Sequence, residues 1–202
     1  MGVYSKIEER WTGISNQTGT SLLGKVKSSD EYLHVLYSPA SKKDIKLFEE
    51  YIFDEKKFDK KILNKFTEIL LEHNGAVLYG GGIVLFGSTD NKSMTPFLYP
   101  ASIVKMNNID FVSSRLNNVI YIGNAWHKSK GNINFYYNLK NGIVSGFIKG
   151  EIVISWPDLE RFYEYIFMSY DNCYGDDGVH HHYDAKEKFV FRNVQLFDEE
   201  KQ

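Results

Sequence analysis

Residues 69–87 (ILLEHNGAVLYGGGIVLFG) change from a helical to an extended apolar pattern, and this change constrains the rest of the chain. The apolar side chains before the change recur at the spacing of one helix face, together with a histidine: Ile62, Leu63, Phe66, Ile69, Leu70 and His73. Gly75 then ends the helix, because glycine adopts the left-handed conformation without a Cβ clash. Residues 77–86 hold two short β-branched or aromatic runs, which a triple glycine separates. The stretch therefore predicts a helix, a sharp turn, and a hairpin or bulged strand.

The segment before this stretch predicts two more helices and one strand. Residues 3–11 favour a short helix, and the polar residues after it favour a loop to Leu22. Residues 32–37 (YLHVLY) are typical of a strand. Ser41, with an aspartate three residues later, has the form of a capping box and predicts a helix over 42–53. The lysines that follow are mixed with acidic residues, which indicates a solvated surface rather than a nucleic-acid site.

The second half of the chain predicts an antiparallel meander. Residues 92–118 are irregular and favour a long loop with one or two helical turns at 102–106, and residues 119–122 are typical of a buried strand. Residues 132–138 alternate between apolar and polar, and Asn141-Gly142 favours a hairpin turn to a partner strand over 143–148. A third strand over 152–154 completes the meander.

A final amphipathic helix follows the meander. Ser155 can cap it, Pro157 is tolerated in its first turn, and Asp158 faces its positive end. Its apolar stripe is Leu159, Phe162, Tyr163, Ile166, Phe167 and Tyr170. This helix is expected to pack on the sheet, and residues 189–197 are expected to add an edge strand.

Length and composition favour one cytoplasmic domain. With 202 residues and 43% hydrophobic content, the chain is long enough for one sizeable core, so we expect a single domain over 1–202. No apolar run approaches the roughly 20 residues that cross a bilayer, and the charged N-terminus differs from a signal peptide. The single cysteine, Cys173, cannot form an internal disulfide, which is typical of a reducing compartment. We therefore expect a cytoplasmic protein with no membrane contact.

Charge is distributed unevenly along the chain. Residues 1–150 hold 19 Lys and Arg against 14 Asp and Glu, whereas residues 151–202 hold 5 against 12. Such an acidic segment can be a solvated surface. It can also form an acidic face for a basic partner, because complementary potentials speed association and set specificity.

The order and spacing of these elements over residues 40–168 resemble the SUKH superfamily, which groups fungal glucan-synthesis regulators with bacterial immunity proteins. Three of the matching features are helices: the segment SKKDIKLFEEYI, the helix that ends at Asn-Gly, and a closing amphipathic helix. The others are the extended segments LYGGGIVLFG, VIYIG and INFYYNLKNGIVSGF. Asn74, Gly75, Gly87 and Gly123 match recurring positions of the family, where we expect structural roles. Residues 1–39 and 170–202 lie outside the match and are interpreted as extensions.

This resemblance implies an α+β fold with a curved, mainly antiparallel sheet and helices packed against it. It also implies binding rather than catalysis, because bacterial members are immunity proteins that neutralise a cognate toxin, often a nuclease or deaminase. We therefore expect a non-enzymatic immunity protein that acts by stoichiometric contact with its toxin, without a cofactor and without direct nucleic-acid binding. The alternative is a regulatory or scaffold protein of the cell-wall-synthesis-regulator type.

Aromatic and acidic side chains near the end of the last predicted helix are the candidates for partner binding. They are Trp126, Tyr170, Asp171, Tyr174, Asp176 and Asp177. Aromatic side chains can anchor an interface, and the aspartates can dock on the basic cleft of a nuclease.

The sequence offers few residues for catalysis or metal binding. The triple glycine lacks the Lys-Ser or Lys-Thr of a phosphate-binding loop, and no histidine is placed by a known signature to activate Cys173. His180 and His182 point the same way in an extended chain, and with Asp176 or Asp184 they can hold a divalent metal. An exposed polar loop is the alternative, so no metal is expected. A metal-dependent hydrolase that uses this loop is the third hypothesis for function.

Overall fold

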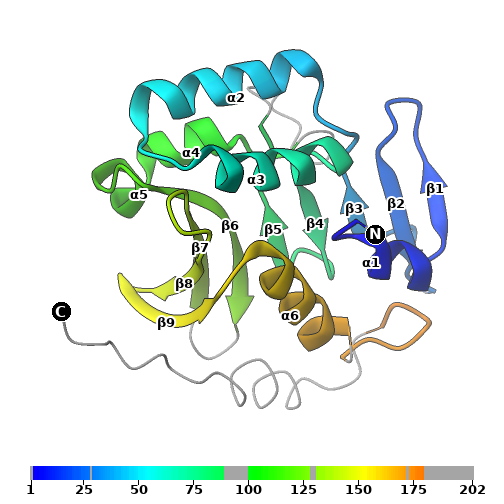
Figure 1. Ribbon diagram of the computed structural model, residues 1–202. Coiled ribbons are helices and arrows are strands. Elements are labelled where there is room, and N and C mark those ends of the chain that lie inside the picture. Colours follow the sequence, from blue (N-terminus) through cyan, green and yellow to red (C-terminus); the bar gives the residue numbers. More distant parts are fainter. Residues whose placement is uncertain (1, 28, 89–99, 128–130, 172, 180–202) are drawn as a thin grey trace.

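The computed structural model describes residues 2–27, 29–88, 100–127, 131–171 and 173–179. These residues form a nine-stranded antiparallel sheet and six helices, so the predicted α+β class with an antiparallel sheet is confirmed (Figure 1). The strands are β1 (Gly13–Ser15), β2 (Ser21–Lys25), β3 (Tyr32–Leu36), β4 (Ala76–Leu78), β5 (Ile83–Leu85), β6 (Val119–His127), β7 (Gly131–Asn138), β8 (Val144–Ile148) and β9 (Glu151–Trp156). The helices are α1 (Ser5–Arg10), α2 (Lys42–Glu55), α3 (Lys60–Glu72), α4 (Ile103–Ile109), α5 (Phe111–Arg115) and α6 (Leu159–Asp171).

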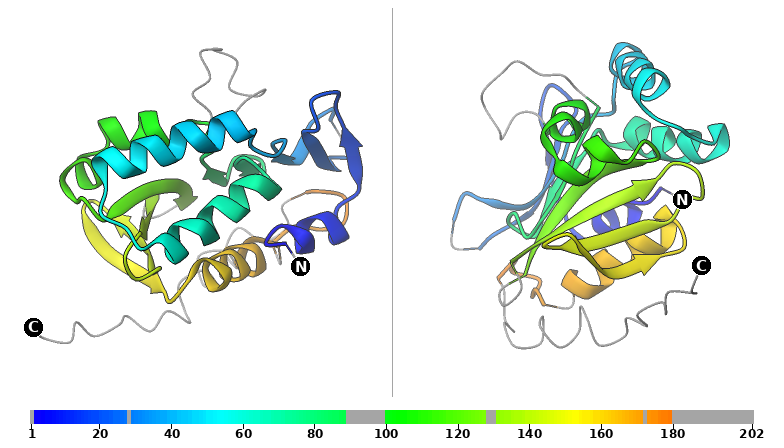
Figure 2. Two further views of the ribbon diagram at one scale, coloured as in Figure 1. Left: turned by 45° about the horizontal axis from the view of Figure 1, so that its top comes forward. Right: turned by 90° about the vertical axis from the view of Figure 1, so that its left-hand side faces the viewer.

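Each strand of the sheet pairs with its neighbours in the chain, so the strand order runs from β1 to β9. Two helix pairs interrupt this meander: α2 and α3 precede β4, and α4 and α5 precede β6. The register shifts between Tyr121 and Gly123 on β6, and between Gly146 and Phe147 on β8. Such bulges bend a strand, and Figure 2 shows α6 beside the bent end of the sheet.

The N-terminal segment contains more regular structure than the sequence predicted. The short helix is confirmed as α1, but residues 12–22, expected as a loop, contain β1 and the start of β2. Asn16 holds the turn between these strands, because its Oδ1 accepts hydrogen bonds from Thr18 N (2.9 Å) and Thr20 N (3.0 Å). A side chain of this kind replaces backbone bonds in a turn. The polar composition that favoured a loop therefore belongs to a hairpin.

The same segment is part of the main core. Tyr4 and Ile7 are each 1% exposed, and Trp11 is 4% exposed. Residues 1–39 lie outside the family resemblance, yet β1 to β3 belong to the same sheet as the other strands, and α1, β2 and β3 contribute residues to the shared core.

Local signals in the sequence place α2 correctly. Ser41 Oγ accepts a hydrogen bond from Asp44 N (3.2 Å), and Asp44 Oδ2 accepts one from Ser41 N (3.0 Å). The predicted capping box is therefore confirmed. Phe48 and Ile52 lie one turn apart on the buried face of the helix.

The turn after α3 joins the end of this helix to the end of β5. Gly75 has a φ of 89°, and a Cβ atom there would lie 2.7 Å from the carbonyl oxygen of Leu85. Asn74 is buried, and its Oδ1 accepts hydrogen bonds from Ser88 N (2.6 Å) and Ser88 Oγ (3.0 Å). Gly87 also lies too close to neighbouring backbone for a Cβ atom, as does Gly123. Glycine is thus required here for close backbone contact as well as for the turn.

The irregular segment over 92–118 contains two helices, α4 and α5. The sequence predicted a loop with one or two helical turns at 102–106, so α4 was predicted in part and α5 was not predicted. The first eight residues of the segment lie outside the described part. Asn107 on α4 is buried. Its Oδ1 accepts a hydrogen bond from Tyr121 N (2.8 Å), and its Nδ2 donates one to Tyr121 O (2.9 Å). This amide takes the place of a strand neighbour at Tyr121, because β5 pairs only with residues 123–125 of β6. A local sequence pattern does not reveal such a contact.

The C-terminal meander and α6 are found where the sequence predicted them, but the helix cap differs. Ser155 lies within β9, and its Oγ hydrogen-bonds Ser145 Oγ at 2.9 Å. Asp158 caps α6 instead, since its Oδ1 accepts from Arg161 N at 2.8 Å. Phe162 packs against Phe135 with ring centroids 4.9 Å apart. The edge strand predicted over residues 189–197 lies outside the described residues.

Candidate functional site

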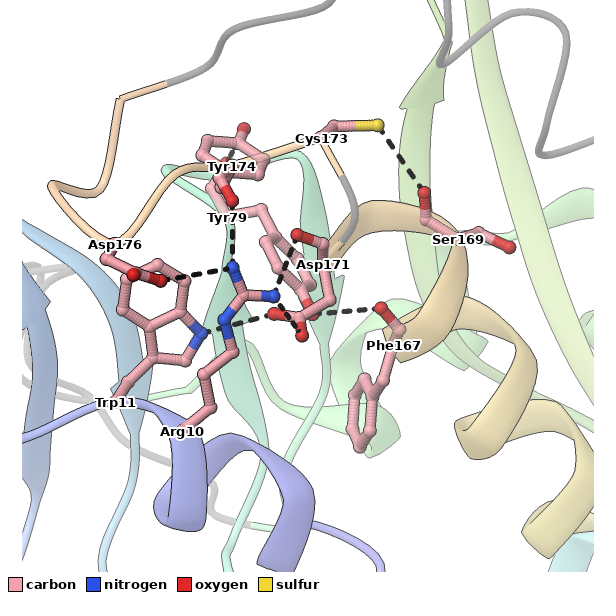
Figure 3. Close-up of polar contacts among 9 residues, drawn as sticks. All are labelled: Arg10, Trp11, Tyr79, Phe167, Ser169, Asp171, Cys173, Tyr174 and Asp176. Carbon is pink, nitrogen blue, oxygen red and sulfur yellow. Dashed lines mark hydrogen bonds and ion pairs between the residues drawn. The ribbon is translucent and has the colours of Figure 1, made fainter.

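An ion pair joins α1 to α6 at the corner where the sequence placed its binding candidates (Figure 3). Asp171 at the end of α6 pairs with Arg10 at the end of α1. Asp171 Oδ1 also accepts from Trp11 Nε1 (3.2 Å) and from the hydroxyl of Tyr79 (3.5 Å). The carboxylate of Asp171 is therefore neutralised and hydrogen-bonded inside the protein.

Arg10 also binds the chain after α6. It donates hydrogen bonds to the carbonyl oxygens of Asp171 (3.0 Å) and Tyr174 (2.8 Å), and its guanidinium lies 3.9 Å from Asp176 (Figure 3). The side chain of Asp176 is fully exposed. Asp177 is half-buried, and its backbone oxygen accepts from Lys27 N (3.2 Å). Of the three predicted aspartates, Asp176 is thus the one most available to a partner.

The three predicted aromatic anchors differ in exposure. Tyr170 is 3% exposed, and its hydroxyl donates to Trp126 O (3.1 Å). Burial raises the pKa of the Tyr170 hydroxyl. Tyr174 is half-buried and donates to Tyr79 O (3.2 Å). Trp126 is 54% exposed, so it alone of the three offers a large aromatic surface to a partner.

A cavity of about 390 Å³ lies beside this corner, but it is not acidic. Its charged lining side chains are Arg10, Lys25 and Asp176. The residues selected from the sequence therefore meet in space, but they do not form a negatively charged recess.

An acidic cleft of about 540 Å³ lies between α1, α3 and the start of α6. Five carboxylates and two lysines line it among the described residues: Glu68, Glu72, Asp158, Glu160, Glu164, Lys6 and Lys65. Apolar side chains also contribute, namely Val3, Ile69, Leu159, Tyr163 and Phe167. We call these residues the acidic cleft. It combines apolar surface with net negative charge, as a docking site for a basic segment requires.

Three of the cleft carboxylates have partners within the protein. Glu164 pairs with Lys6 (3.3 Å) and Arg161 (2.6 Å), and hydrogen bonds from Arg161 first and Lys6 second lower the pKa of the Glu164 carboxyl. Glu72 accepts hydrogen bonds from Val3 N and Tyr4 N. Asp158 caps the start of α6.

The other two cleft carboxylates, Glu68 and Glu160, are exposed. They come from different helices, so their charges meet only after folding. The sequence predicted an acidic face from the imbalance over residues 151–202 but assigned it to residues 171–177. The signals that could have found the cleft are the spacing of Glu68 and Glu72 by one helix turn, and the acidic start of α6.

The remaining catalytic and metal candidates are placed as follows. Cys173 is buried, and its Sγ donates to Ser169 O (3.5 Å). The triple glycine forms the turn between β4 and β5. His180 and His182, with Asp184, lie outside the described residues.

In the described part of the chain no helix is long and apolar enough to cross a membrane.

Comparison with known proteins gives no relative, since no family model, curated protein or solved structure matches the chain.

Proposed function

We propose that this chain is a SUKH-like immunity protein that binds a basic protein toxin, of nuclease or deaminase type, through the acidic cleft. The observation that carries the proposal is the cleft itself. Its carboxylates outnumber its lysines by five to two, and apolar side chains lie between them. A nuclease binds a polyanion and therefore presents positive charge. An inhibitor that covers such a surface benefits from negative charge of its own.

The order of elements also supports the SUKH-like part of the proposal. Two helices precede the hairpin of β4 and β5, and a meander from β6 to β9 leads into α6. The family-matching residues Asn74 and Gly75 connect the end of α3 to β5. These are the features on which the resemblance rests, and their strands belong to one sheet.

The acidic cleft is a better docking surface than the corner around Asp171. Asp171 is engaged by Arg10, and Tyr170 is buried. Glu68 and Glu160, in contrast, are exposed and lie in a recess. Association with the toxin should therefore depend on Glu68 and Glu160 more than on the aspartates after α6.

Affinity purification of the tagged full-length chain from its source cell tests the proposal. A single partner in equimolar amount is expected, and that partner should arrest growth when it is expressed alone. The variant Glu68→Gln with Glu160→Gln should recover much less of it at low salt, and its difference from the wild type should shrink as salt rises, because screening weakens the charge attraction that only the wild type keeps in full. Asp176→Asn with Asp177→Asn removes the same charge elsewhere and is the matched control, which should recover as much as the wild type.

Recovery of several regulatory proteins and no toxin would overturn the proposal in favour of a scaffold. Equal loss in both double variants would show that net charge, rather than the acidic cleft, determines binding.

A further inference from the structure

Three metal-ligating atoms converge where α1 meets the end of α3. They belong to Glu8, Glu72 and His73, and all lie within 4.8 Å of one another. Glu8 comes from α1, whereas Glu72 is the last residue of α3 and His73 follows it. The cluster combines one imidazole with two carboxylates, so it is more than a group of acidic residues.

Hydrogen bonding fixes the orientation of the His73 ring. His73 is 7% exposed, and its Nδ1 lies 3.0 Å from the carbonyl oxygen of Tyr37. Since a carbonyl oxygen can only accept, Nδ1 carries a proton and donates it. Nε2 of the neutral ring then carries a lone pair. A backbone carbonyl on the outer nitrogen is the usual arrangement for a histidine that binds a metal.

The lone pair of Nε2 faces a second acceptor. Glu8 Oε1 lies 3.2 Å from His73 Nε2. Two acceptors at this distance require a positive centre between them, either a second proton on the ring or a metal ion. Two ligands of a tetrahedral ion with bonds of about 2.0–2.1 Å are themselves about 3.3 Å apart. The observed separation therefore suits a shared ion without rearrangement of either side chain.

The third ligand is also fixed in place. Glu72 Oε2 accepts from Val3 N (3.1 Å), and its Oε1 accepts from Tyr4 N (3.1 Å). These bonds leave lone pairs on both oxygens, because an ionised carboxylate accepts about four hydrogen bonds. The Tyr4 ring stands edge-on to the His73 ring at 5.1 Å, which restricts the imidazole further.

We propose that Glu8, Glu72 and His73 form a binding site for a first-row divalent metal ion of the zinc class. An imidazole with two carboxylates suits zinc and its neighbours, whereas magnesium and calcium prefer oxygen alone. Glu8 is exposed, so water can complete the coordination. The ion ties α1 to the end of α3 and, through Tyr37, to the end of β3. It thereby stabilises the N-terminal helix. The metal site shares Glu72 with the acidic cleft but does not depend on the exposed cleft carboxylates, Glu68 and Glu160.

Zinc titration by calorimetry tests the site after removal of adventitious metal. The full-length chain carries His180→Ala, His181→Ala and His182→Ala, because histidine runs bind zinc by themselves. One zinc ion per chain is expected, with no comparable binding of magnesium. Glu8→Gln should weaken zinc binding at least about tenfold. Glu9→Gln removes the same charge from the next residue of α1, which is also exposed, and this variant should bind zinc as the parent does.

Two further readouts locate the ion. Zinc should raise the thermal unfolding midpoint of the parent and of Glu9→Gln but not of Glu8→Gln. In the nitrogen NMR spectrum, zinc should change the chemical shift of His73 Nε2 and leave the chemical shifts of the buried His34 ring unchanged. Absence of saturable zinc binding, or equal binding by Glu8→Gln and Glu9→Gln, would overturn the proposal.

Discussion

Asp171 forms an ion pair with Arg10, although 161 residues separate them in the chain. Their side chains are 27% and 29% exposed, so the pair is partly shielded from water. The same carboxylate accepts from Trp11 Nε1, and the same guanidinium donates to Tyr174 O. The pair therefore joins α1, the end of α6 and the following loop into one unit.

Removal of either charge of this pair should destabilise the fold. Asp171→Asn and Arg10→Met should each lower the free energy of unfolding by about 2 kcal/mol, because each leaves a partly buried charge without its partner. The double variant should lose less than the sum, with a coupling energy of about 1 kcal/mol. Urea unfolding of the four proteins measures this coupling. Strict additivity would show that the two side chains contribute independently.

Two glycines with the same backbone angle should respond differently to alanine. Gly75 and Gly81 both have a φ of 89°, but only Gly75 has backbone atoms next to the position of a Cβ. Gly81→Ala should cost about 1 kcal/mol of stability, which is the usual cost of the left-handed conformation. Gly75→Ala should cost about 3 kcal/mol, because the carbonyl of Leu85 must also move. Equal losses by chemical denaturation would show that contact with β5 is unimportant.

His34 should make the fold sensitive to acid. Its ring is fully buried, and neither nitrogen has a hydrogen-bond partner among the described residues. Burial first, and the charge of Arg10 second, lower the pKa of His34 from 6.5 to about 3. Between these values the unfolded chain binds a proton that the folded chain does not. Stability should therefore fall with decreasing pH, by at most about 1.4 kcal/mol per pH unit from this group.

The variant His34→Leu isolates the contribution of this histidine. Its unfolding free energy should depend on pH less steeply than that of the wild type between about pH 4 and 6, where unfolded histidine is mostly charged. Carboxylates contribute to the pH dependence of both proteins, so their contribution cancels when the two unfolding free energies are subtracted. Parallel pH profiles would show that His34 becomes protonated without cost in the folded state.

Elements with local signals in the sequence were predicted well. The capping box at Ser41 gives the start of α2, and Gly142 lies in the turn between β7 and β8 as predicted. Such signals act within a few residues, so a single sequence contains them. The first hairpin was missed because its turn depends on the side chain of Asn16. The helix α4 was predicted only as a helical turn or two, because Asn107 gains its partner, Tyr121, from a distant strand.

The acidic cleft could be predicted only in part. The charge imbalance over residues 151–202 indicated a negative surface. Three carboxylates of this segment, Asp158, Glu160 and Glu164, line the cleft. Glu68 and Glu72 come from α3, and no local pattern shows that α3 lies beside α6. The engagement of Asp171 by Arg10 is equally non-local. A charge count along the chain therefore detects an acidic surface but not its position.

Growth protection tests the central claim most directly. The toxin partner is expressed in cells together with the wild-type chain, with Glu68→Gln and Glu160→Gln, or with Asp176→Asn and Asp177→Asn, at equal levels of folded protein. The wild type and the Asp176/Asp177 variant should restore growth, whereas the Glu68/Glu160 variant should restore much less. Full protection by the Glu68/Glu160 variant would contradict the role of the acidic cleft, and failure of the wild type to protect would contradict immunity itself.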